Sequence, residues 1–414
     1  MAIDFAIRNV RLPHSLQSTD IGVEGGLIAV IEPGFVCDAP EHDAGGKLVC
    51  GGLIETHIHL DKAGIIGRCS ICAGTLAEAV SETAKAKSGF TEEDVYERAS
   101  LVLEKAILNG TTRLRTFVEV DPRAGYRSLD AITRLKADYA DAIEVEICAF
   151  AQEGLTNEPA TEAMLETALQ SGADLVGGCP YTDPQPAEHI RGIFDLGERF
   201  GIPVDFHLDF HLDPRSSDLP EIIAQTMTRR YEGRVSIGHV TNLSAATSEE
   251  LEALGKSLAN AGIAVTALPA TDLFLMGRKF DCLIPRGVAP IHRLAAYGVV
   301  TTLSTNNVLN PFTPFGDVSL MRMANLYANI AQIGAPADLE GIFDMITVRA
   351  AKLVGKGRKS LEVGAPANLV IFDACSSSDA VAEIAPAVTG WKDGRQTFLR
   401  PLPQLLRSAR QPKA

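Results

Sequence analysis

Four of the nine histidines in this chain stand where a metal ion could use them. His57 and His59 form a His-Ile-His sequence at the end of an apolar stretch, and strand alternation points both rings to one side. His207 ends the stretch VDFH, and His239 ends the stretch RVSIGH. Imidazole nitrogen is a good ligand for zinc and ferrous iron, so the pattern predicts one divalent metal site. A single histidine would more often be structural, and the combination of positions carries the prediction.

These histidines can meet only if the stretches that carry them lie side by side. Eight short apolar segments alternate with helical patterns, as expected for buried parallel strands. Several follow a helix that ends in glycine, as at Gly201 and Gly262. The repeat predicts an α/β fold with a closed (β/α)8 TIM-like barrel, whose active site lies at the carboxyl ends of the strands. The eight segments lie near residues 52–57, 112–118, 143–149, 174–178, 203–207, 234–238, 263–267 and 299–303.

The two ends of the chain share a different pattern. Short apolar runs alternate with turn residues in IGVEGGLIAVIEPG near the start, and again in LEVGAPANLVIFDA after about residue 355. We therefore predict a small β-sandwich domain built from both termini, residues 1–50 and 355–414, beside a hydrolase barrel at 51–354.

Composition narrows the class of protein. The chain has 414 residues, of which 46% are hydrophobic and 22% charged, as in an ordinary globular enzyme with a large core. A formal net charge of −14 disfavours nucleic acid as a partner. The chain shows no signal peptide pattern and no apolar stretch of membrane-spanning length. We expect a cytoplasmic homo-oligomer that acts on a small molecule and binds neither nucleic acid nor a membrane.

Six stretches resemble those of cytosine-deaminase-like and N-isopropylammelide-amidohydrolase-like members of the amidohydrolase superfamily. They occur in the family's order across essentially the whole chain: LIETHIHLDK, AFAQEGL, VDFHLDF, IGHVT, LPATDLFLMGR and NNVLNPFTPFG. The resemblance implies a single divalent ion, Zn²⁺ or Fe²⁺, because the fourth strand lacks the lysine of binuclear members. It implies that the metal ligands are His57, His59, His207 and Asn306, that His239 and Asn306 serve catalysis, and that Gln152 contacts the substrate. We also predict that Asp209, Phe210 and Asn307, which lie within these stretches, contact the substrate.

Two of these positions depart from the family. Phe210 stands where the deaminases carry glutamate, and a phenyl ring transfers no protons. Asn306 stands where aspartate is expected, and its carboxamide can ligate a metal but is no base. His239 is our first candidate to replace the missing groups. The further candidates are Asp209, His211 and Asp61, of which the two aspartates could instead orient an imidazole ring through a hydrogen bond.

Two kinds of residue near the motifs bear on the substrate. Lys62 could contact an anionic substrate, although a solvated loop lysine is more common. Phe210, Phe312 and Phe315 could line an apolar pocket that accepts a ring, although aromatic side chains more often pack loops together.

The leading hypothesis is a metal-dependent hydrolase that uses metal-activated water on a non-peptide C–N bond in a small cyclic or aryl amide, urea or amine. One alternative is an aminohydrolase, a deaminase of a nitrogen heterocycle such as a pyrimidine or triazine, with His211 or Asp209 as the acid. Another is a ligand-binding pseudoenzyme that lost its proton-transfer groups at Phe210 and Asn306. The sequence leaves the substrate, the metal and the oligomeric state open.

Overall fold

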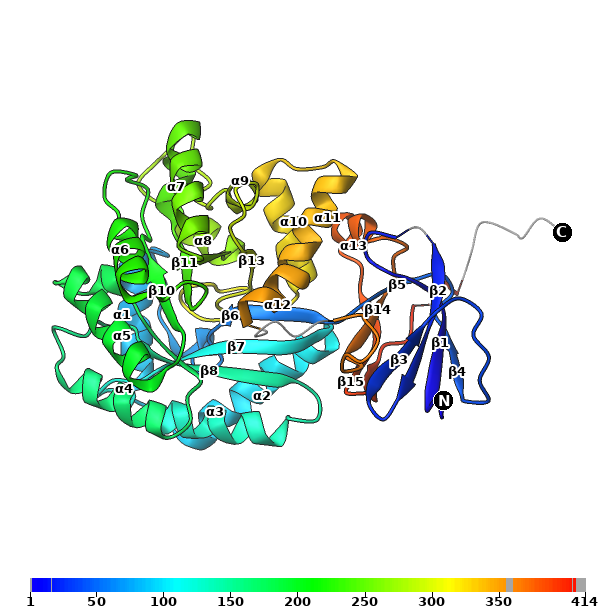
Figure 1. Cartoon of the computed structure of the whole chain (residues 1–414). Coiled ribbons are helices and arrows are strands. Elements are labelled where there is room, and N and C mark those ends of the chain that lie inside the picture. Colours follow the sequence, from blue (N-terminus) through cyan, green and yellow to red (C-terminus); the bar gives the residue numbers. More distant parts are fainter. Residues whose placement is uncertain (1, 16, 355–359, 404, 407–414) are drawn as a thin grey trace.

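The computed structural model describes residues 2–15, 17–354, 360–403 and 405–406. Its larger part is an eight-stranded parallel sheet rolled into a barrel, and a smaller sheet from both chain ends lies beside it (Figure 1). The barrel strands are β6 (Leu53–Ile58), β7 (Thr111–Glu119), β8 (Glu144–Ala151), β9 (Leu175–Gly178), β10 (Val204–Leu208), β11 (Val235–His239), β12 (Ala264–Ala267) and β13 (Thr301–Leu303). The predicted barrel and each of its eight strands are confirmed.

The barrel closes between its first and last strands, β6 and β13. Just beyond β13, Asn306 forms a parallel bridge with Ile58. Its backbone N–H donates to the carbonyl of His57 at 3.0 Å, and its carbonyl accepts from the N–H of His59 at 2.9 Å. The closure therefore fixes Asn306 against two of the predicted metal ligands.

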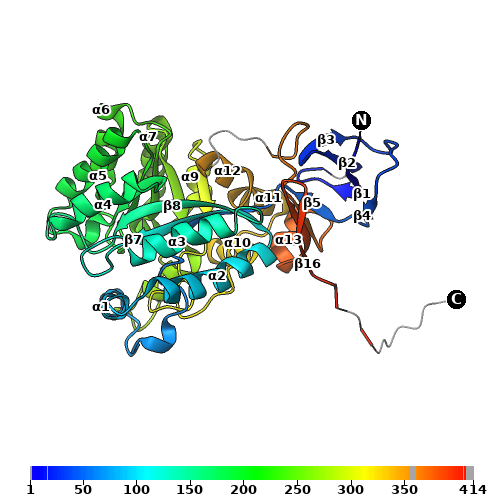
Figure 2. The ribbon, with the colours of Figure 1, turned by 90° about the horizontal axis from the view of Figure 1, so that it is seen from below.

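Helices cover the outside of the barrel (Figure 2). Their sequence signals are local: Gly201 ends one helix in the left-handed conformation at φ 67°, and Thr247 begins another with a capping box. No helix in the described ranges is long and apolar enough to cross a membrane. The helices are α1 (Leu76–Lys87), α2 (Glu92–Leu108), α3 (Arg127–Asp138), α4 (Ala160–Gln170), α5 (Pro186–Phe200), α6 (Leu219–Arg229), α7 (Ser248–Asn260), α8 (Pro269–Leu275), α9 (Ile291–Ala295), α10 (Leu320–Ala331), α11 (Pro336–Met345), α12 (Val348–Val354) and α13 (Ser377–Glu383).

The smaller sheet joins the two ends of the chain. Its strands are β1 (Phe5–Arg11), β2 (Ser18–Glu24), β3 (Leu27–Ile31), β4 (Glu41–Asp43), β5 (Leu48–Cys50), β14 (Leu369–Phe372), β15 (Ala387–Lys392) and β16 (Arg395–Leu399). They run in the order β16-β15-β14-β5-β1-β2-β3, with β4 on β1, and β14 pairs antiparallel to β5. The small domain predicted from both termini is therefore present, and it takes the form of one continuous hydrogen-bonded sheet. Ile7, Val49, Ile371 and Trp391 share its core.

The exact domain bounds remain a prediction. β5 ends at Cys50 and β6 begins at Leu53, which is compatible with a first boundary at residue 50. The second boundary, at 354 and 355, adjoins residues 355–359, which lie outside the described residues.

Candidate active site

Three imidazole rings converge at the carboxyl end of the barrel. His57 and His59 come from the end of β6 and His207 from β10, and one ring nitrogen of each lies within 4.8 Å of the others. The Nε2 atoms of His57 and His207 face each other directly. Burial lowers the pKa of all three rings well below the usual value, and nearby positive charges add to this effect. The rings are therefore neutral, as metal ligands must be.

Asn306 completes this group of donors. It has φ 60°, a left-handed conformation that asparagine tolerates better than most residues. Both side-chain atoms, Oδ1 and Nδ2, are buried without a hydrogen-bond partner, as is Nδ1 of His59. Unpaired buried polar atoms are costly, and a cation between the rings and the amide oxygen would remove part of that cost. The residues present thus fit a single divalent metal ion.

His239 has a carboxylate partner that sequence analysis missed. Its Nδ1 lies 2.6 Å from Oδ1 of Asp272 on α8, and the other carboxylate oxygen accepts from the N–H of Leu268 at 3.1 Å. Burial raises the pKa of Asp272, and His239 opposes that rise. His239 and Val240 both have positive φ, 71° and 42°, which is rare strain for a β-branched valine. This backbone and the carboxylate together fix the direction of the imidazole ring.

A signal for Asp272 was present in the sequence. The residue is a lone carboxylate in the apolar stretch LPATDLFL, which directly follows the seventh barrel strand. Charged residues are seldom fully buried without a partner, so a carboxylate in such a stretch at the active-site end of the barrel indicates a partner nearby.

A narrow cavity opens beside these groups. The ring of Phe210 lies 4.4 Å from the ring of His239, so a phenyl ring occupies the place where a carboxylic acid was sought. The cavity is lined by His59, Lys62, Leu76, Gln152, Tyr181, His207, Phe210, His239, Thr271, Asn306, Asn307 and Phe312. Of the nine residues predicted for metal binding, catalysis or substrate contact, seven line this cavity. An eighth, His57, adjoins it through the rings of His59 and His207.

Lys62 differs from its predicted place. It is only 2% exposed rather than solvated, because the turn after β6 folds its side chain back into the barrel mouth. Its ammonium donates to Oε1 of Gln152 at 2.9 Å and to Oε1 of Glu119 at 2.7 Å, and it lies 4.7 Å from the ring of Phe312. Lys62 therefore lines the cavity as a buried charged residue.

The structure gives the remaining polar candidates other partners. Asp209 accepts hydrogen bonds from Ser217, Asp218 and Asn242 and does not line the cavity. Asp61 accepts from the backbone N–H groups of Lys62 at 2.8 Å and Glu119 at 3.0 Å. His211 lies in an outer groove that shares Phe210 with the cavity. The predicted substrate contact of Asp209 and the orientation of imidazoles by either aspartate have no support in this geometry, because these carboxylates hold loops.

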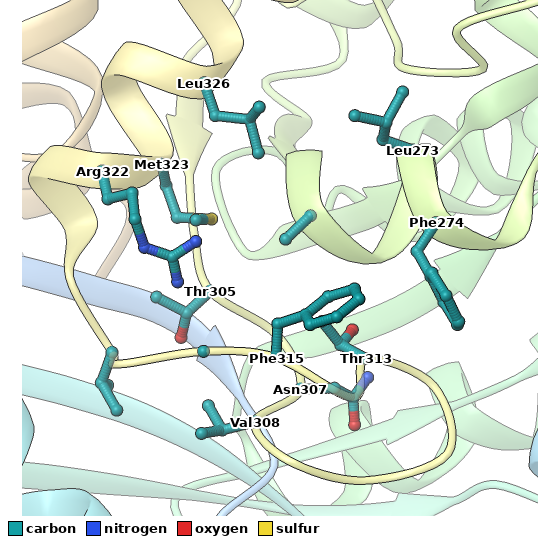
Figure 3. A pocket seen from close by; sticks show the side chains of 13 residues that line it. Leu273, Phe274, Thr305, Asn307, Val308, Thr313, Phe315, Arg322, Met323 and Leu326 are labelled. Carbon is teal, nitrogen blue, oxygen red and sulfur yellow. The ribbon is translucent and has the colours of Figure 1, made fainter.

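Phe315 lies in a pocket other than the catalytic cavity. It is 59% exposed and lines a second, largely apolar pocket with Leu273, Phe274, Met323 and Leu326 (Figure 3). Asn307 borders both spaces. Phe210 and Phe312 are the two phenylalanines that line the cavity itself.

A sequence profile described as the Amidohydrolase family matches residues 110–398. The chain belongs to the amidohydrolase family. This amidohydrolase is 26% identical over 407 residues to N-isopropylammelide isopropyl amidohydrolase of Pseudomonas sp. (strain ADP), with 95% of this chain and 96% of that protein covered. It is also 26% identical to pterin deaminase of Rhizobium rhizogenes, with 87% of this chain and 83% of that protein covered.

Solved structures agree with the family assignment. The fold matches 5-methylcytosine deaminase of Klebsiella pneumoniae liganded with 5-fluorocytosine, with a TM-score of 0.93, 27% identity, and coverage of 97% of this chain and 99% of that one. It also matches N-isopropylammelide isopropylaminohydrolase of Burkholderia multivorans, with a TM-score of 0.84, 26% identity, and coverage of 95% and 97%. This amidohydrolase is therefore an enzyme that hydrolyses C–N bonds other than peptide bonds. The alternative of an inactive ligand-binding protein finds no support in these comparisons.

Proposed function

We propose that this amidohydrolase releases an amine from a small nitrogen heterocycle by means of one divalent metal ion. The observation that carries the proposal is the convergence of three neutral imidazoles and the unpaired amide of Asn306 on one buried cavity. The ligands are His57, His59, His207 and Oδ1 of Asn306, a nitrogen and oxygen set that suits Zn²⁺ or Fe²⁺. When bound, such an ion supplies Lewis-acid chemistry, which lowers the pKa of a water molecule to near neutrality.

His239 is the proton carrier in this proposal. Asp272 holds Nδ1, which leaves Nε2 as the ring nitrogen free to take a proton from the attacking water and return it to the departing nitrogen. Asn306 cannot take that proton because its side chain is a neutral amide. Phe210 cannot donate it either, so His239, Lys62 and Tyr181 are the candidates for proton transfer among the described residues that line the cavity, besides the ligand histidines.

The remaining walls indicate what the substrate looks like. Phe210 and Phe312 offer flat apolar faces, which suit a planar ring. Lys62 offers an ammonium group, Gln152 and Asn307 offer amide groups, and these bind ring oxygens or nitrogens. We infer an oxygen-bearing nitrogen heterocycle with an exocyclic amine. The relatives are named for compounds of this kind: N-isopropylammelide, pterin and 5-methylcytosine.

Two leaving groups remain in competition. Release of a substituted amine is favoured because Phe210 places an apolar ring, with no carboxyl group, next to His239. Release of ammonia from an unsubstituted amine is favoured by the fold, which follows 5-methylcytosine deaminase over 97% of this chain. His211 and Asp209 do not support the second reaction, since neither lines the cavity.

The experiment is a turnover screen of metal-free protein reloaded separately with Zn²⁺ and Fe²⁺. N-isopropylammelide, 5-methylcytosine, cytosine and pterin serve as substrates, and mass spectrometry separates alkylamine release from ammonia release. We expect metal-dependent release of isopropylamine, with no turnover by the chelated protein or by His207→Asn. Release of ammonia alone would select the deaminase, and turnover that survives metal removal would contradict the proposal.

A further inference from the structure

A row of buried charges leads away from the cavity at Lys62. Lys62 follows β6, Glu119 is the last residue of β7, and Lys87 is the last residue of α1. Glu119 accepts from Lys62 through Oε1 at 2.7 Å and from Lys87 through Oε2 at 2.9 Å. The three side chains are 2%, 3% and 2% exposed. One carboxylate therefore binds two ammonium groups in the interior.

The carboxylates around Lys87 do not form a second metal site. Glu119, Asp121 and Glu153 bring their oxygens within 4.8 Å of one another, as metal ligands would. The ammonium of Lys87, however, pairs with all three of them. Arg123 also pairs with Glu153 where the row reaches the surface. The three cations and three carboxylates of this row balance, so it needs no further cation.

The ammonium of Lys62 lies among groups that oppose its charge. Burial disfavours any charged group, and the positive field of Lys62 already lowers the pKa of His57, His59 and His207. A divalent ion in the same cavity would add to that repulsion. Among the described residues, Glu119 is the carboxylate that contacts Lys62 Nζ.

We propose that Glu119, itself paired with Lys87, is a positioning residue that supplies the counter-charge of the Lys62 ammonium and holds it in place as a hydrogen-bond donor to the substrate. Glu119 and Gln152 take two of the three N–H bonds of Lys62, which leaves one for the cavity. The contact of Lys62 with the substrate rests on the proposed function. The effect of Glu119 on the charge of Lys62 does not.

Other titratable groups also face this pair and are shared by every variant below. Asp61 adjoins Lys62, and burial with the charge of Glu119 raises its pKa to about 6. The thiol of Cys179 interacts with both Lys62 and Glu119, and burial raises its pKa to about 12. The three histidines lie on the cavity side, and Asp121 and Glu153 lie behind Lys87.

The test reads the charge of Lys62 without requiring turnover. Metal-loaded protein is trace-labelled with acetic anhydride over a pH series, and mass spectrometry of the peptide that carries Lys62 gives the pH of half-maximal labelling. In Glu119→Gln this pH should fall by at least one unit, because a buried ammonium loses its counter-charge. In Lys87→Met it should stay or rise, because a neighbouring positive charge is lost.

General damage to the structure would lower the labelling pH in both variants, whereas this proposal expects a fall in Glu119→Gln and no fall in Lys87→Met. Glu146→Gln is the matched control, since Glu146 accepts from the buried Arg115 at 2.7 Å in a different ion pair. It should leave the labelling pH of Lys62 unchanged. If Lys87→Met fails to fold, the comparison of Glu119→Gln with Glu146→Gln still tests the proposal. An unchanged labelling pH in Glu119→Gln, or equal shifts in all variants, would overturn the proposal.

Activity on whichever compound the screen identifies gives a second reading. As the pH is raised, kcat/KM of Glu119→Gln should fall at a lower pH than kcat/KM of the wild type. Adding Lys62→Arg should restore a flat alkaline profile, because a guanidinium stays charged. A labelling shift without turnover would leave this electrostatic role standing and count against the proposed function, so the two can fail separately.

Discussion

At the scale of single residues, the direction of His239 depends on one buried carboxylate. Asp272 binds Nδ1 at 2.6 Å and is itself held by a backbone N–H. Such a partner fixes the tautomer of the ring and stabilises it when it carries a proton. The proton transfer proposed for His239 should therefore weaken greatly when this carboxylate is lost.

We predict that Asp272→Asn lowers kcat about 100-fold or more, since loss of the orienting aspartate in a comparable arrangement costs up to about 10⁴. KM and metal content should change little, because Asp272 contacts neither the cavity nor the three clustered histidines. Steady-state kinetics and metal analysis of the same preparation measure both. An unchanged kcat would remove His239 from its assigned role.

A second residue-scale prediction concerns Gly238 on β11. A Cβ atom here would lie 2.8 Å from Cε1 and 3.1 Å from Nδ1 of His57, so alanine would displace that ring. We expect Gly238→Ala to weaken metal affinity about 10-fold or more, as outer contacts of metal ligands do. Competition with a fluorescent chelator measures it. Gly341→Ala is the control, because nothing lies within 4 Å of its Cβ, and equal affinities in both variants would contradict the prediction.

Sequence analysis found most residues of the cavity but not all of the groups that hold them. His57, His59 and His207 were predictable because each stands at a strand end, and the barrel brings strand ends together. Asp272 and the burial of Lys62 were not predicted, because each depends on how a loop folds back over the barrel mouth. The hydrogen-bond partners of Asp209 and Asp61 were not predicted for the same reason: closeness in sequence to a ligand does not say which way a carboxylate points.

At the scale of elements, strands were easier to predict than their pairing. β10 is buried at every residue, and its sequence VDFHL has the period-two alternation of apolar and polar residues that predicts a strand. The bridge of Asn306 to Ile58 depends on the stagger of β6 and β13. Nothing in either sequence fixes that stagger, so closure of the barrel could be predicted but the register of this bridge could not.

The charges that link β6, β7 and α1 make acid stability an element-scale property. Burial raises the pKa of Glu119, but Lys62 and Lys87 overcome this effect and lower it from 4.5 to about 2. A carboxylate whose pKa is lower in the folded state adds stability above pH 4.5, and that stability is lost as the pH falls towards 2.

We therefore predict that the free energy of unfolding of Glu119→Gln declines less than that of the wild type, by about 3 kcal/mol at most over the whole range and by about 2 kcal/mol between about pH 5 and about pH 3. Urea unfolding at about pH 5 and about pH 3 measures the difference, with Glu146→Gln as the comparison. A decline as steep as in the wild type would show that Glu119 is not held in its charged form by these lysines.

At the scale of the whole molecule, part of the smaller sheet packs into the apolar core of the barrel. Leu48 of β5 and Val370, Phe372 and Phe398 of the C-terminal strands belong to the same apolar cluster as the barrel strands. The chain also passes directly from β5 into β6. We expect the two parts to unfold together.

The single tryptophan allows this to be checked. Trp391 lies in the smaller sheet, 5.8 Å from the ring of Phe5, whereas the helices surround the barrel. Tryptophan fluorescence should therefore report the small sheet and far-ultraviolet circular dichroism mainly the barrel. We predict coincident urea transitions from the two signals. A fluorescence transition at lower urea would show that the small sheet unfolds first.

The pairing of β5 with β14 also has a consequence for translation. The nascent chain makes β1 to β5 first, but their partner strand emerges only after the entire barrel has left the ribosome. Until then the edge of β5 exposes unpaired backbone groups, which invite misassembly with other chains. Chaperone dependence in cells should thus fall chiefly on the earliest residues rather than on the strands that carry the chemistry.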